Sequence, residues 1–251
     1  MSDESEAGRS HGLEWLGSLA LALAVAFGCR AFVIEPFRIP SESMLPTLRI
    51  GDHLFVNKFV YGARVPLLGW RLPAWRDPER GEVVVFEVAK NGGETLPADR
   101  RPGLPREDYV KRIIGLPGDR IDFVDGVVFV NGDPFVVRSQ GKPVQDATGR
   151  ALLRREVTLG DRAFAVLDDP DQTPRPGSHV VEEGRYFFLG DNRDWSKDSR
   201  IWGTVRRADL KGPAFLLYWS WDFDGSWLAL LNPATWWNAD VRWERVGSRV
   251  Q

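Results

Sequence analysis

The stretch YVKRIIGLPGDRIDFVDGVVFVNG, residues 109–132, decides the fold class of this chain. Its short runs of Val, Ile and Phe are separated by turn-forming pairs such as Asp125-Gly126 and Asn131-Gly132. Short β-branched runs between such pairs are typical of β-strands joined by tight turns. We therefore expect strands at residues 120–124 and 127–130, joined as a hairpin by Asp125-Gly126.

Comparable runs recur on either side of this stretch. Residues 82–88 read EVVVFEV and residues 186–189 read YFFL, and both are rich in residues that favour strands. No long amphipathic helical pattern occurs after residue 35, so the body of the chain is predicted to be mainly β. The segments 62–77 and 89–107, rich in Pro, Gly, Arg or Trp, are predicted to be surface loops.

Residues 15–34, WLGSLALALAVAFGCRAFVI, are predicted to form one N-terminal transmembrane helix. They carry one charge, Arg30, and about 20 helical residues roughly match a hydrocarbon core of ~30 Å. Two alternatives are a cleaved signal peptide and a buried helix of a soluble protein. The segment before Trp15 holds four acidic residues and one arginine, which argues against a signal peptide. Because this segment carries almost no basic residues, the positive-inside rule does not decide which way the helix crosses the membrane.

The composition excludes some classes of protein. A hydrophobic share of 43% indicates a folded body, and a net charge of -2 gives no basic footprint for nucleic acid. One cysteine, Cys29, allows no intrachain disulfide. Of 11 tryptophans, six lie near the C-terminus: Trp219, Trp221, Trp227, Trp236, Trp237 and Trp243. They suit either a surface resting on a bilayer or an ordinary core.

Two polar segments carry reactive side chains and also have ordinary structural interpretations. Ser41 and Ser43 lie beside a Pro-bounded turn, where serine is usually a loop or helix-cap residue. Residues 190–200, GDNRDWSKDSR, are dense in charge and turn formers. By themselves they would fit a calcium loop or a salt-bridged turn.

Lys111 stands within an apolar, β-prone run. A lysine there is usually a surface residue, although Val110, Ile113 and Ile114 offer apolar surroundings. Because side chains alternate along a strand, Lys111 and Arg112 point to opposite faces, and one of them faces inward.

The histidines give no support to a Ser-His-Asp triad. There are three, His11, His53 and His179, and His11 precedes the membrane segment. No G-x-S-x-G nucleophile elbow, H-E-x-x-H motif or Cys/His cluster occurs, so we expect neither a metal nor another cofactor.

In their order along the chain, four segments resemble the bacterial type I signal peptidases, the leader peptidases of the general secretion pathway. The segments are residues 35–48 (EPFRIPSESMLPTL), 80–86 (RGEVVVF), 109–119 (YVKRIIGLPGD) and 190–200 (GDNRDWSKDSR). The ordered set, directly behind a membrane segment, is more specific than any one of them. The resemblance implies a signal-peptidase-like β fold with a catalytic core and a smaller inserted lobe.

The resemblance also implies a role for each matching residue. Ser43 is expected to be the nucleophile and Lys111 the general base. The hydroxyl of Ser41 and the backbone N–H of Ser43 match the oxyanion hole, and Ser196 matches the hydroxyl that hydrogen-bonds the base. The charged residues expected to brace the site are Arg112, Asp191, Asp198 and Arg200.

Substrate pockets are implied in the same way. Their expected lining is apolar, with ordinary core packing as the alternative for each member: Phe37, Ile39, Met44, Leu48, Tyr109 and Val110. Two positions depart from the family pattern. Trp195 stands where Asn or Ser is usual, and Glu42 stands where many members carry Gly, but neither replaces a reacting group.

The expected domain map has five parts. An N-terminal tail (1–14) precedes the anchor (15–34), and the catalytic β core comes in two pieces (35–132 and 184–251) around the inserted β lobe (133–183). The second piece of the core ends in the Trp-rich, membrane-proximal C-terminus.

By resemblance, the chain is a membrane-bound serine endopeptidase that removes signal peptides from secreted preproteins after a small-x-small motif. Its partners are then preprotein signal peptides and the lipid bilayer, and it acts as a monomer. It would sit in the bacterial cytoplasmic membrane with one span and its catalytic domain on the extracytoplasmic side. Two rivals are a self-cleaving Ser-Lys protease of the repressor type and a catalytically silent β protein that binds emerging preproteins.

Overall fold

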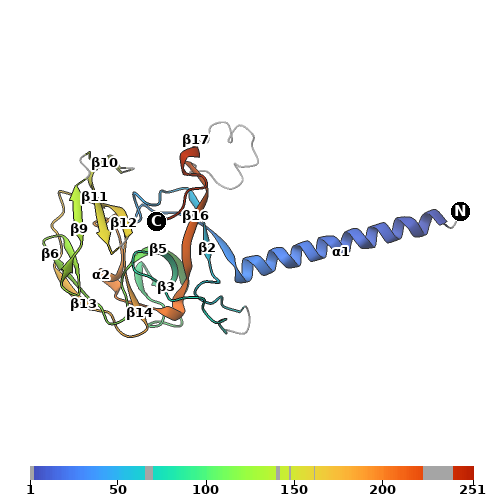
Figure 1. Cartoon of the computed structure of the whole chain (residues 1–251), viewed down its shortest axis with the longest axis horizontal. Coiled ribbons are helices and arrows are strands. Elements are labelled where there is room, and N and C mark those ends of the chain that lie inside the picture. The colour runs from blue at the N-terminus through green and yellow to red at the C-terminus, as the bar shows by residue number, and fades with distance from the viewer. Residues whose placement is uncertain (1–2, 66–69, 140–141, 147, 161, 223–239) are drawn as a thin grey trace.

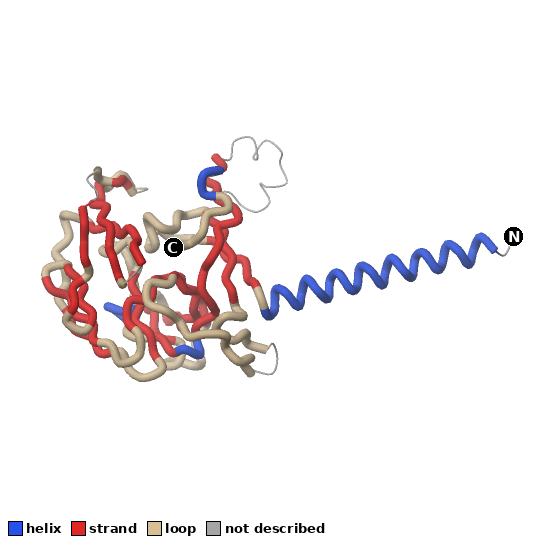
Figure 2. Tube along the Cα trace, viewed as in Figure 1, coloured by secondary structure: helices blue, strands red, loops and turns tan. Residues whose placement is uncertain are grey.

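The chain consists of one long helix and a β body from which that helix projects (Figure 1). A computed structural model describes residues 3–65, 70–139, 142–146, 148–160, 162–222 and 240–251. The two smaller sheets lie on the side of the body away from the helix (Figures 1 and 2).

The elements follow one another mostly as short strands. The helices are α1 (Asp3–Phe32), α2 (Ser199–Trp202) and the 3-10 turns η1 (Arg207–Asp209) and η3 (Trp243–Arg245). The strands of the first half are β1 (Ile34–Arg38), β2 (Asp52–Asn57), β3 (Val83–Asn91), β4 (Glu94–Pro97), β5 (Arg106–Gly115), β6 (Arg120–Val124), β7 (Val127–Val130) and β8 (Asp133–Pro134). Those of the second half are β9 (Val136–Ser139), β10 (Val144–Gln145), β11 (Ala151–Leu159), β12 (Arg162–Asp168), β13 (Gly177–Val180), β14 (Arg185–Leu189), β15 (Val205–Arg206), β16 (Leu210–Asp222) and β17 (Asp240–Val241).

The largest sheet positions the candidate site. Its nine strands run in the order β1-β2-β16-β3-β5-β14-β15, with β17 beside β16 and β4 beside β3. Strand β3 is buried on both faces, because Val84 and Phe86 pack in one apolar cluster while Val83 and Val85 pack in another. Burial of both faces explains why residues 82–88 are almost continuously apolar instead of alternating.

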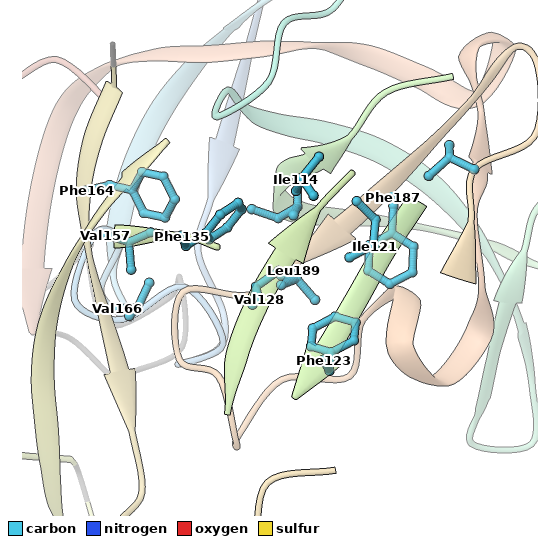
Figure 3. Packing of buried hydrophobic residues seen from close by; sticks show 12 residues of the cluster. Ile114, Ile121, Phe123, Val128, Phe135, Val157, Phe164, Val166, Phe187 and Leu189 are labelled. Carbon is cyan, nitrogen blue, oxygen red and sulfur yellow. The ribbon is translucent and has the colours of Figure 1, made fainter. Parts of the chain in front are cut away.

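Two four-stranded sheets make up the rest of the body. One has the order β10-β11-β12 with β9 beside β11, and the other has the order β13-β6-β7-β8. Figure 3 shows the cluster that joins them to the large sheet: Ile114 of β5 and Phe187 of β14 pack with Phe123, Val128 and Phe164. The lobe boundaries at residues 133 and 183 remain a prediction.

The expected hairpin is confirmed in position and register. Strands β6 and β7 have the predicted bounds, and Val124 pairs with Val127 across the turn. Asp125 and Gly126 have φ values of 49° and 78°. Positive φ at both central residues is what a type I′ turn requires.

The prediction that residues 89–107 form a surface loop is wrong at both ends of the segment and at residues 94–97, which lie in strands. Strand β3 continues to Asn91, β4 pairs with it, and β5 begins at Arg106. Thr95 and Ala98 are buried. Tertiary packing overrides the local turn signals here, because the hairpin lies against the core. The described part of segment 62–77 is irregular apart from an isolated bridge between Arg64 and Arg71.

The N-terminal helix α1 contains an apolar window, Trp15–Phe32, with a mean hydropathy of 1.6 and no buried residue. The helix is therefore not buried within the described body of this chain. The helix ends at Phe32, and Ile34 already belongs to β1, so the last two residues of the predicted span leave the helix.

The C-terminal tryptophans are only partly described. Trp219 and Trp221 of β16 are half-buried, whereas Trp243 is 68% exposed and makes an edge-to-face contact with Trp219. Trp227, Trp236 and Trp237 lie outside the described residues. Whether this region rests on a bilayer stays a prediction.

Candidate active site

The candidate residues come from three segments that are distant in sequence. The turn between β1 and β2 carries Ser43, strand β5 carries Lys111, and the loop between β14 and α2 carries Ser196. The backbone N–H of Asn192 donates to the Ser43 carbonyl over 3.1 Å and ties the third segment to the first. The expected nucleophile and the expected base therefore meet through tertiary contacts.

The structure places Ser43 and Lys111 in direct contact. The Nζ of Lys111 lies 2.6 Å from the Oγ of Ser43 and donates to the Val110 carbonyl over 3.0 Å. Lys111 is only 3% exposed, whereas Ser43 is half-buried. A half-buried hydroxyl within hydrogen-bond distance of an amine that is shielded from water is the arrangement that a nucleophile and its general base require.

Apolar neighbours shield the amine of Lys111 from water. In the β3–β5 ladder Lys111 lies opposite Val84, on the face of β5 that also carries Ile113. Val110 and Ile114 lie on the other face, so of the three neighbours named from the sequence only Ile113 shares the side of the amine. Burial lowers the pKa of Lys111 from its ordinary 10.5 to about 8, and the carboxylates of Asp198 and Asp191 oppose this shift only in part.

One of those carboxylates is held by Arg112. Its Nε and Nη2 donate to the two oxygens of Asp191 over 2.8 and 2.7 Å, and both side chains are 1% exposed. The Oγ1 of Thr47 donates to the same carboxylate over 2.5 Å. A bidentate guanidinium neutralises Asp191 locally, which limits its ability to hold a proton on Lys111.

The other carboxylate is held by Arg200 in the same way. Asp198 is fully buried and accepts from Arg200 Nε over 2.8 Å and Nη2 over 2.7 Å. It also caps α2 and accepts from the backbone N–H of Gly190 over 3.0 Å. The four bracing residues expected from the resemblance thus form two ion pairs beside the amine, one fully buried and one partly buried.

The two remaining serines are placed differently from each other. The Oγ of Ser41 is exposed and lies 3.4 Å from the Oγ of Ser43. The Oγ of Ser196 is buried and, within the described part of the chain, has no hydrogen-bond partner. The expected bond from Ser196 to Lys111 is thus not formed in this geometry, because the amine is engaged by Ser43 and Val110. A role for Ser196 in orienting the base stays a prediction.

Gly190 allows Ser196 to lie close to the backbone of Ser43. A Cβ at position 190 would lie 2.2 Å from the Ser196 Oγ and 2.5 Å from the Ser43 carbonyl oxygen. No side chain fits in that space, so only glycine lets the two loops approach each other.

Trp195, the main departure from the family pattern, contacts the smaller lobe. Its Nε1 donates to Asp169 over 3.0 Å, and the guanidinium of Arg150 lies 3.3 Å from its ring centroid. The ring is 41% exposed. Trp195 therefore links the loop of Ser196 to the inserted segment without contacting Ser43 or Lys111 through any hydrogen bond of the described residues.

The expected pocket residues divide into two groups. Ile39, Met44 and Leu48 are buried in the cluster between β2, β3 and β16, which is the packing alternative. Phe37 and Val110 are only partly buried against that cluster. The sixth residue, Tyr109, is half-buried beside the amine. Pocket lining remains a prediction for all six.

Two residues of the site had no role in the sequence-based expectations. The Nδ2 of Asn192 donates to the Glu42 carbonyl over 3.2 Å, in addition to the backbone bond to Ser43. Thr47 bonds to Asp191, as described above. Both lie within segments that carry the family resemblance, which was the available signal, but their partners depend on how the loops pack.

The described histidine contacts lie elsewhere. His53 makes edge-to-face contacts with Tyr218 and Trp221, and His179 packs on Phe123 and Phe187. Among the residues that the structure describes, no group of three or more His, Cys, Asp or Glu side chains could hold a metal ion.

Comparison with known proteins agrees with this geometry. The family described as signal peptidase, peptidase S26, matches residues 12–219. A signal peptidase I of Haemophilus influenzae is 34% identical over 96% of this chain and 77% of its own length. A signal peptidase I of Pseudomonas fluorescens is 33% identical over 83% of this chain and 73% of its own. The signal peptidase IB of Staphylococcus aureus strain Mu50 is 32% identical over 82% of this chain and 89% of its own length.

Proposed function

The chain belongs to the signal peptidase family, peptidase S26, and is a serine peptidase that acts on peptide bonds. On that premise we propose that it removes N-terminal signal peptides from secreted preproteins, with Ser43 as nucleophile and Lys111 as general base. The observation that carries the proposal is the 2.6 Å contact between the Ser43 Oγ and the buried Lys111 Nζ.

Acylation begins with the neutral amine. Lys111 takes the proton of Ser43, and the Oγ attacks the scissile carbonyl carbon to form a tetrahedral oxyanion. The backbone N–H of Ser43 and the hydroxyl of Ser41 donate to that oxyanion; one such donor is typically worth ~10²–10³ in rate. The ammonium then gives its proton to the leaving amine, and the signal peptide remains as an ester on Ser43.

Deacylation uses the same base a second time. Once the mature protein leaves, Lys111 is neutral again and takes a proton from water, which attacks the ester. Its proton then returns to the Ser43 Oγ as the signal peptide departs. A base with a pKa near the working pH serves both directions of transfer, and a pKa of about 8 supports that role for Lys111.

We propose that the substrates carry small residues on both sides of one variable residue before the cut. Small pockets accept Ala by excluding larger side chains, and the expected lining is Phe37, Ile39, Met44, Leu48, Tyr109 and Val110. The partial exposure of Phe37 and Tyr109 supports their direct contact with substrate. The three buried members, led by Met44, would act as the packed floor beneath them.

The proposed setting is the bacterial cytoplasmic membrane. The exposed apolar window Trp15–Phe32 supports a single span, with the β body and Ser43 on the extracytoplasmic side. Secreted preproteins emerge there, so a peptidase held by one helix meets its substrates at the surface of the bilayer.

The test is cleavage of a preprotein by the full chain in detergent micelles. We expect cleavage after a small-x-small site by the wild type and by Ser178→Ala, an exposed serine of β13 that serves as a control. Ser43→Ala should bind the preprotein without cutting it. Equal binding and no cleavage by the wild type would support a preprotein-binding scaffold instead, and cleavage only within its own chain would support the repressor-type protease.

A further inference from the structure

A hairpin that the sequence analysis assigned to a surface loop reaches the neighbourhood of the proposed base. Lys90, near the end of β3, donates to the hydroxyl of Tyr109 over 2.6 Å and to the Oγ1 of Thr95 over 3.2 Å. The Thr95 Oγ1 and the Tyr109 hydroxyl are 3.1 Å apart. Two hairpin side chains therefore hold the phenol end of Tyr109 by a closed triangle of hydrogen bonds.

The other part of the same ring lies against the base. Tyr109 and Lys111 are two residues apart on β5 and share one face of the strand. The Nζ of Lys111 lies 5.4 Å from the Tyr109 ring centroid, and the Nζ of Lys90 lies 4.9 Å from it. The ring thus lies close to both amines: its hydroxyl is bonded to the amine on the hairpin, and the amine in the site lies over the ring.

The pKa values of the two amines are shifted in opposite directions. Burial tends to lower the pKa of Lys90, but its hydrogen bond to Tyr109 and the nearby Glu107 carboxylate outweigh burial and raise it. Lys90 therefore stays an ammonium at neutral pH, and it forms an ion pair with Glu107 over 3.5 Å. Its donated proton also draws electron density from the phenol oxygen, which weakens the attraction of the ring face for a second cation.

From this geometry we propose that Lys90 and Thr95 are positioning residues, which hold the Tyr109 ring over Lys111 and so keep the general base out of water. The inference rests on the proposed function. Among the described residues, the groups around the amine are Ser43 from the β1–β2 turn, the Asp191 and Asp198 carboxylates with their partners Arg112 and Arg200, and the Tyr109 ring held by Lys90.

The direction of the effect follows from desolvation. A loosened ring admits water to Lys111, water favours the charged amine, and the pKa of the base rises. Loss of the neighbouring Lys90 cation acts in the same direction, though partial exposure of Lys90 to solvent screens it. The acid limb of kcat/KM should therefore move to higher pH, while the plateau at high pH, where the base is neutral in either case, stays the same.

The experiment measures kcat/KM against pH for the full chain in detergent. For Lys90→Met, whose side chain has similar length, the acid limb should move up by about 0.5 unit, which is roughly a threefold loss at pH 7. Tyr109→Phe keeps the ring without its two bonds and should shift the limb less, and Thr95→Val should shift it least. Lys58→Met serves as the matched control, because Lys58 is another half-buried lysine with a carboxylate partner, Glu35.

Two results would overturn the inference. In one, the acid limbs of Lys90→Met and Tyr109→Phe coincide with that of the control. In the other, the plateau falls while the limb stays in place, as expected for a purely structural role. A wild type without Ser43-dependent cleavage, or with a rate that has no acid limb, would instead refute the proposed function, so the two failures are distinguishable.

Discussion

Two adjacent residues of β5, Lys111 and Arg112, carry buried cationic groups with opposite surroundings. Lys111 faces Val84, the Tyr109 ring and a serine hydroxyl. Arg112 faces a carboxylate, which it binds through two nitrogens, and also donates to the Gly81 carbonyl over 2.7 Å. The surroundings of Lys111 thus favour loss of its proton, whereas the surroundings of Arg112 compensate the permanent charge of its guanidinium.

The difference shows how a fold can lower the pKa of an amine that lies close to two acids. Asp191 and Asp198 raise the pKa of Lys111, but burial lowers it by more, and each carboxylate is bound by its own arginine. A charged group buried away from water is tolerated when it has a partner of opposite charge. Burial of an amine without such a partner lowers the pKa of the amine instead. On this interpretation the ion pairs support stability directly and catalysis indirectly.

The largest effect should follow from Lys111→Met. Replacing the base with an apolar side chain of similar length should lower kcat/KM by about 10²–10⁴-fold, the usual contribution of general acid–base catalysis. Stability should not fall, because Met needs no desolvation. Preprotein cleavage and denaturant unfolding of the same preparation check both statements, with Lys58→Met as the control. Cleavage within tenfold of the wild type would remove Lys111 from the mechanism.

The opposite outcome is expected for Arg112→Met. Leaving Asp191 buried without its partner should lower the free energy of unfolding by about 3–5 kcal/mol. Tryptophan fluorescence in a denaturant titration measures this loss. The double variant Arg112→Met/Asp191→Leu should recover much of it, because both buried charges are then gone. If the double variant is as unstable as the sum of the two single variants, the pair is not coupled as described.

The dependence of stability on pH should report the lowered pKa of Lys111 directly. Between pH about 8 and 10.5 the unfolded state holds a proton on Lys111 that the folded state has lost. Stability therefore rises with pH across this window, by about 3 kcal/mol in total. The unfolding free energy of the wild type minus that of Lys111→Met should show this rise. A flat curve for Lys111 would mean that its pKa is not lowered.

The smallest effect should come from Ser196→Ala. The buried hydroxyl has no partner among the described residues, so its removal should not destabilise the fold. If it orients the amine while Lys111 holds the proton, kcat should fall by about tenfold, within the range of one supporting hydrogen bond. Steady-state kinetics beside thermal unfolding test this. Unchanged kcat would exclude Ser196 from catalysis.

Much of the molecule was predictable because the responsible forces act locally. The apolar run of α1 and the turn residues Asp125-Gly126 determine their own conformation, and both were predicted correctly. The strands at 120–124 and 127–130 follow from alternating β-branched residues. The resemblance also located Ser43 and Lys111, although no local pattern explained why a serine and a lysine should meet.

Only the tertiary structure decided what surrounds the amine. Ser43 and Lys111 are 68 residues apart, and their contact depends on the register of β3 with β5 and on the Asn192 bond. The hairpin with Lys90 and Thr95 looked like a surface loop because its Gly and Pro residues signal turns, while its packing partners are distant in sequence. The sequence by itself therefore determined the strands, the turns and the reactive groups. Burial and charge pairing, which set the chemistry of Lys111, come from contacts that form only when distant segments pack together.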